Sequence, residues 1–92
     1  MNIVIRKRAY DDLDSIYVWI SQSNPEAAAH VVQRLRQKMG QVSFSGMSES
    51  GRPGRDPGTR ELIEGPYIIV YEIQEAEGFI EVLAIFHSAQ DR

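Results

Sequence analysis

Residues 59–87 read TRELIEGPYIIVYEIQEAEGFIEVLAIFH, and this stretch determines the fold class. It contains three runs rich in β-branched and aromatic residues, 59–63, 67–73 and 79–87, which are separated by turn sequences at 64–66 and 74–78. Turns this short join only neighbouring antiparallel strands. The pattern therefore predicts a three-stranded antiparallel meander.

The residues before the meander predict a short strand and two helices. Residues 3–5 are β-branched and indicate a strand. Apolar residues then recur with helical spacing over 8–21 and from Pro25 to about Val42 or Phe44, and Asn24 before Pro25 is a strong helix-start signal. We expect a single domain over residues 1–92 with an α+β fold of order β-α-α-β-β-β, in which a helical hairpin packs on one face of a small antiparallel sheet.

The central strand of this meander is apolar on both faces. The odd-numbered residues of 67–73 would lie on one face, and Ile68 and Val70 on the other. Two helices can cover only one of these faces. The other face is covered by a partner protein, is covered by the Gly- and Pro-rich loop 45–58, or stays exposed as aliphatic surface. We favour a partner. Trp19, outside the main apolar stripe of its helix, is a second candidate contact for one.

Composition excludes several classes of protein. The 92 residues contain no cysteine, which excludes disulfide scaffolds, Cys-ligated zinc fingers and thiol nucleophiles and suits a reducing cytoplasm. We expect neither a signal peptide nor a membrane span. The net charge of −3 weakens attraction to nucleic acid as a whole, so any such contact must be local.

The segments GRPG (51–54), GTREL (58–62), PYIIVY (66–71) and IFH (85–87), in this order of elements, resemble the RelE/ParE toxin family over nearly the whole chain. The resemblance implies a cytoplasmic toxin of a bacterial type II toxin–antitoxin module, of the kind linked to plasmid stabilization. It also implies a hetero-oligomer with a cognate antitoxin, through which alone operator DNA would be contacted. RelE-like members cleave messenger RNA on the ribosome, and ParE-like members inhibit DNA gyrase.

The resemblance also implies candidate site residues. In a metal-free ribonuclease, Arg60 would hold phosphate, Glu61 would act as general base and His87 as general acid. In either branch Arg52, Arg55 and Arg60 are the candidate target contacts, and Trp19, Tyr67 and Tyr71 are the candidate antitoxin contacts. No cofactor and no metal are expected.

Two departures from the sequence pattern of RNA-cleaving members favour the ParE-like branch and a toxin that is not an enzyme. Ile68 stands where RNA-cleaving relatives commonly place an arginine, and the second half of the chain has no lysine. The alternatives are a ribosome-dependent ribonuclease and a non-toxic member that only binds its antitoxin.

Plainer roles remain open for the same residues. Arg52 and Arg55 could be solubilising loop charges, and Tyr67 and Tyr71 could be core residues. His87, on the face expected to carry Leu83 and Ile85, could be a hydrogen-bonded packing residue.

Overall fold

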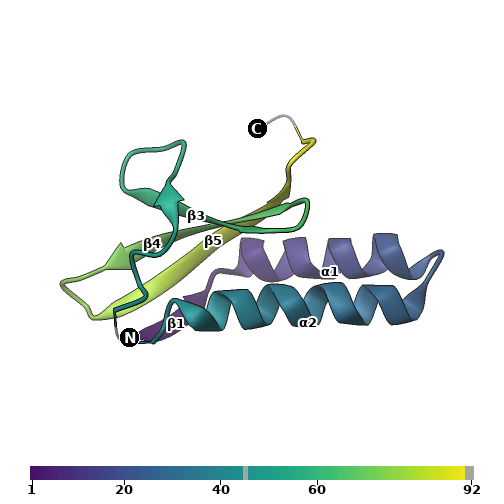
Figure 1. Ribbon diagram of the computed structural model, residues 1–92, viewed down its shortest axis with the longest axis horizontal. Coiled ribbons are helices and arrows are strands. Elements are labelled where there is room, and N and C mark those ends of the chain that lie inside the picture. Colours follow the sequence, from purple (N-terminus) through teal and green to yellow (C-terminus); the bar gives the residue numbers. More distant parts are fainter. Residues whose placement is uncertain (45, 91–92) are drawn as a thin grey trace.

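The computed structural model describes residues 1–44 and 46–90. Two antiparallel helices lie against one face of a five-stranded sheet, so the predicted α+β class with a helical hairpin on one face of a sheet is confirmed (Figure 1). The elements are β1 (Asn2–Ile5), α1 (Lys7–Ser21), α2 (Pro25–Gln41), β2 (Arg52–Pro53), β3 (Thr59–Glu64), β4 (Tyr67–Gln74) and β5 (Phe79–His87).

The sheet has the order β1-β5-β4-β3-β2. It is mixed, whereas the sequence predicted an antiparallel sheet. β1 runs parallel to β5, with Ile3 opposite Ile80 and Ile5 opposite Val82. This arrangement places Ile3 and Ile5 against the core that the helices cover. A further strand that the sequence did not predict, β2, lies within the Gly- and Pro-rich loop and pairs with β3.

The helical hairpin forms for the reasons that the sequence gives. The side chain of Asn24 accepts a hydrogen bond from the Ala27 amide at 3.1 Å, and Pro25 occupies the first turn of α2. Leu13 of α1 and Leu35 and Met39 of α2 are buried against the sheet.

A bulge in β5 changes which of its residues face the helices. Val70 pairs with Ala84, but Tyr71 pairs with Val82, so Leu83 is an extra residue. Ile85 therefore lies in the same core as Ile80 and Val82, because one inserted residue reverses the alternation of faces. Ile85 and His87 share a face as expected, since both line one cavity, and Leu83 is the extra residue of the bulge.

The face of the sheet away from the helices is largely closed by the chain itself. Ile68, Val70 and Ala84 keep no more than 9% exposure there. Arg55 and Asp56 of the loop share a concavity with Val70, so the loop alternative accounts for part of this cover. Burial of these three residues therefore needs no partner, although a partner was the favoured cover, and Ile63 remains 44% exposed.

Candidate functional site

Two side chains fix the loop that carries the predicted target-binding arginines. The buried Tyr71 hydroxyl donates to the Ser48 carbonyl at 2.8 Å and accepts from the Gly51 amide at 3.0 Å. The Arg60 guanidinium donates to the carbonyls of Gly51 at 2.9 Å and Glu49 at 3.3 Å. Only glycine fits at position 51, since a Cβ there would lie 2.7 Å from the Tyr71 hydroxyl and 2.8 Å from the Glu61 carbonyl oxygen.

The loop borders a concavity on the face opposite the helices. It has a volume of about 400 Å³. Its lining residues are Arg8, Arg55, Asp56, Thr59, Glu61, Val70 and Phe86. Glu61 at this site is 4% exposed and accepts hydrogen bonds from Arg52 at 3.0 and 3.1 Å. The paired carboxylate holds Arg52 at the rim, where more than half of the arginine side chain stays exposed.

The three predicted target contacts therefore separate into two groups. Arg52 and Arg55 are exposed, and their positions suit contact with a partner. Arg60 is only partly exposed and donates hydrogen bonds to two main-chain carbonyls of the loop. Its position suits a structural role more closely than direct contact with a target.

The three residues of the predicted ribonuclease set do not come together. Arg60 and Glu61 are adjacent on β3, so their side chains leave the sheet on opposite faces. Glu61 lies on the open face, whereas His87 lies on the helix side, where its ring makes an edge contact with Tyr67 at 5.4 Å between centroids. Glu61 and His87 also lie two strands apart, which adds about 10 Å of separation.

Two of the three predicted antitoxin contacts border one cavity on the helix side of the sheet. Trp19 and Tyr67 line it, together with Ile16, Ile85 and His87, and its volume is about 290 Å³. The Trp19 side chain is among the exposed large hydrophobic groups, at 75%. Tyr71 has no exposed surface, so its side chain cannot be offered to a partner in this structure, and its hydroxyl serves the loop instead.

Arg8, Asp12 and Phe86 also border these two surfaces, and the sequence reasoning missed them. The Arg8 guanidinium lies 5.1 Å from the centroid of the Phe86 ring, and its Nε bonds both carboxylate oxygens of Asp12 at 3.2 Å. The i,i+4 spacing of Arg8 and Asp12 was a readable signal for this pair. Their proximity to Phe86 depends on how α1 packs beside β5, which no local pattern indicates.

Two other features are absent from residues 1–44 and 46–90. No cluster of His, Cys, Asp or Glu side chains there has the arrangement of a metal site. No helix in that part of the chain is long and apolar enough to cross a membrane.

Comparison with known proteins gives consistent matches. Residues 3–92 match the family described as the ParE toxin of the type II toxin–antitoxin system parDE. A protein of Sinorhizobium fredii (strain NBRC 101917 / NGR234), named as a toxin, Y4kP, is 39% identical over 85 residues, covering 90% of this chain and 83% of the relative.

Two solved structures share the fold. A chain of the chromosomal ParDE toxin–antitoxin system from P. aeruginosa is 27% identical, with a TM-score of 0.82 and 95% of each chain covered. A chain of the toxin–antitoxin complex RelBE2 from Mycobacterium tuberculosis is 20% identical, with a TM-score of 0.60, and covers 94% of this chain and 95% of its own. The second likeness concerns the fold alone.

Proposed function

This chain belongs to the ParE toxin family of type II toxin–antitoxin systems, and from that premise we propose that it inhibits DNA gyrase by binding and is neutralised by a cognate antitoxin. The gyrase target follows from the ParE-like resemblance. Binding, as opposed to RNA cleavage, is supported by one observation in particular. The candidate base Glu61 and the candidate acid His87 lie on opposite faces of the sheet.

Proton transfer requires the base and the acid to reach one scissile phosphate together, within about 3 Å of the protons they move. Because the sheet lies between Glu61 and His87, the two groups cannot reach one phosphate unless the structure rearranges. The Glu61 side chain is also only 4% exposed and ion-paired with Arg52, so its carboxylate has little access to a substrate. These features favour a toxin that holds its target over one that cleaves it.

The surface around Arg52, Arg55 and Arg8 supports a target contact. The arginines are exposed at the rim of a concavity, and the loop that carries two of them is fixed by Tyr71 and Arg60. A pre-ordered cationic loop loses little conformational entropy on binding. The cavity beside Trp19 and Tyr67 supports a separate antitoxin contact, since exposed tryptophan and tyrosine are enriched at binding hot spots.

A gyrase supercoiling assay with the purified chain tests the target. We expect inhibition that is lost in Arg55→Glu and kept in Arg36→Glu, which makes the same charge change on the exposed surface of α2. Absence of inhibition at every concentration would contradict the gyrase proposal.

The two alternatives predict different results in growing cells. A ribonuclease would produce cuts in translated messages, seen by primer extension, and Glu61→Gln would abolish them. A non-toxic member would leave growth unaffected when the chain is expressed alone. Copurification with the product of the adjacent gene tests the antitoxin proposal independently of both.

A further inference from the structure

The last part of β5 lacks a neighbouring strand on the side away from β4. β1 pairs only with residues 79–82, and the Arg6 amide then donates to the Val82 carbonyl at 3.0 Å before α1 begins. In the part of the chain that the structure describes, no strand continues this pairing along residues 83–87. We call these five residues the distal edge of β5.

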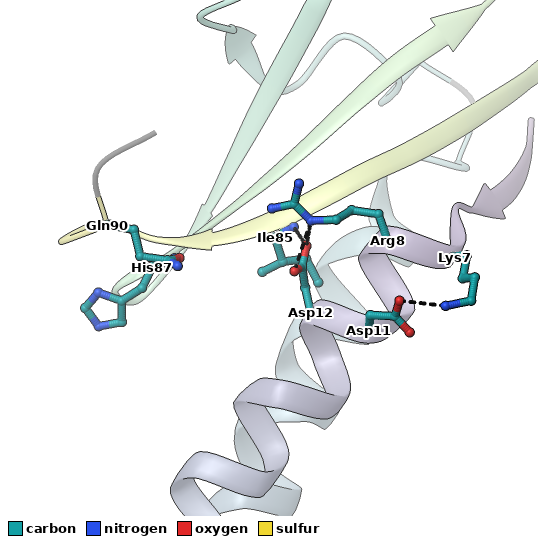
Figure 2. A network of polar contacts seen from close by, with 7 residues as sticks. All are labelled: Lys7, Arg8, Asp11, Asp12, Ile85, His87 and Gln90. Carbon is teal, nitrogen blue, oxygen red and sulfur yellow. Dashed lines mark hydrogen bonds and ion pairs between the residues drawn. The ribbon is translucent and has the colours of Figure 1, made fainter.

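Side chains take the place of the missing strand at this edge (Figure 2). The Ile85 amide donates to Asp12 Oδ2 at 2.9 Å, and the His87 amide donates to Gln90 Oε1 at 2.5 Å. Amides two residues apart in a strand point the same way, so both point away from β4. A carboxylate and a carboxamide thus accept where the carbonyls of a further strand would accept.

The position of the Asp12 side chain is fixed by an ion pair and by partial burial. Its carboxylate is ion-paired with Arg8 at 3.2 Å, and its side chain is only 19% exposed because α1 packs beside β5. The guanidinium in turn lies over the Phe86 ring. A strand approaching this edge would have to displace a charged side chain that is already paired on both sides.

We propose that Asp12 and Gln90 form a surrogate strand that closes the distal edge of β5 and prevents a second copy of the chain from pairing there. The segment Val82–Phe86 is apolar throughout, and such segments pair readily when an edge is open. A two-fold related copy would bring two of these edges together antiparallel. The opposite edge of the sheet, β2, is only two residues long and contains Pro53, so it is a poor template for pairing.

Replacement of Asp12 by alanine tests the proposal on the purified chain. In Asp12→Ala we expect amide exchange at Ile85 to become at least about tenfold faster at low protein concentration, and light scattering after gel filtration to show dimers or larger species that increase with concentration. An Asp12→Ala chain that stays monomeric and keeps wild-type exchange at Ile85 would overturn the proposal.

Matched variants separate the hydrogen bond from the ion pair. Asp12→Asn keeps an acceptor oxygen but loses the charge, and Arg8→Ala removes the ion pair but leaves the carboxylate, so both should remain monomeric. Asp11→Ala serves as the control, because Asp11 bonds Lys7 at 2.9 Å and raises the pKa of that ammonium without touching β5. Association of Asp12→Asn or Arg8→Ala to the same extent as Asp12→Ala would show that the ion pair, not edge closure, matters.

Gln90→Ala removes the second acceptor at this edge and tests the proposal even if Asp12→Ala fails to fold. This residue is exposed and lies outside the core, so its loss should leave the far-UV circular dichroism unchanged. We expect faster exchange at His87 and a smaller shift toward dimers. Unchanged exchange and mass in Gln90→Ala, together with an unfolded Asp12→Ala, would refute the proposal.

Discussion

Removal of one oxygen atom, in Tyr71→Phe, should release the loop that carries the exposed arginines. The Tyr71 ring is fully buried, so the phenylalanine ring fits the same space. Two hydrogen bonds disappear with the hydroxyl, one to the Ser48 carbonyl at 2.8 Å and one from the buried Gly51 amide at 3.0 Å. The packing of the core is otherwise retained.

The expected loss of stability follows from these two bonds. Each contributes about 1 kcal/mol net, so the free energy of unfolding should fall by about 2 kcal/mol. For a domain of this size that corresponds to a melting temperature lower by about 8–16 °C. Urea unfolding followed by circular dichroism measures the first quantity, and the rate of trypsin cleavage after Arg55 reports whether the loop itself is released, since the bond after Arg52 precedes Pro53 and resists trypsin.

Tyr17→Phe is the matched control, because Tyr17 is 43% exposed on α1 and lies beside Val32 and Arg36 of α2. It should change stability by less than about 0.5 kcal/mol. The reasoning is refuted if Tyr71→Phe is as stable as Tyr17→Phe, or if stability falls while trypsin cleaves the loop no faster than in the wild type.

Three further predictions concern the loop and the aromatic cavity. Gly51→Ala should destabilise by about 1–3 kcal/mol through overpacking, whereas Gly40→Ala, with nothing near its added Cβ in α2, should stabilise by about 0.5–1 kcal/mol; thermal melts compare the two. Arg52→Ala should lower the free energy of unfolding by about 1–2 kcal/mol, because it removes the cation that pairs with the buried Glu61 carboxylate. The double variant with Glu61→Gln, which removes the carboxylate charge as well, should recover most of that stability in urea titrations. Trp19→Ala should leave the melting temperature unchanged but weaken binding of the adjacent gene's product at least tenfold by calorimetry, and equal affinity would contradict an antitoxin contact there.

The elements could be predicted from sequence because their causes are local. Asn24 before Pro25 marks the start of α2, and the turn sequences 64–66 and 74–78 impose the meander. The bulge at Leu83 could not be predicted, because nothing in an unbroken apolar run indicates where one residue will be inserted. That single insertion decided that Ile85 shares a face with Ile80 and Val82.

The candidate site shows the same division. The sequence by itself determined that cationic residues gather in a Gly- and Pro-rich loop before the meander, and that the chain resembles the RelE/ParE toxins. Only the tertiary structure decided that Arg60 and Tyr71 hold this loop while Arg52 and Arg55 face outward. Residue types and short spacings are readable from one chain, but the partner of a buried hydroxyl or guanidinium depends on segments brought together by folding. The separation of Glu61 from His87 by the sheet has the same origin, since pairing between distant strands fixes it.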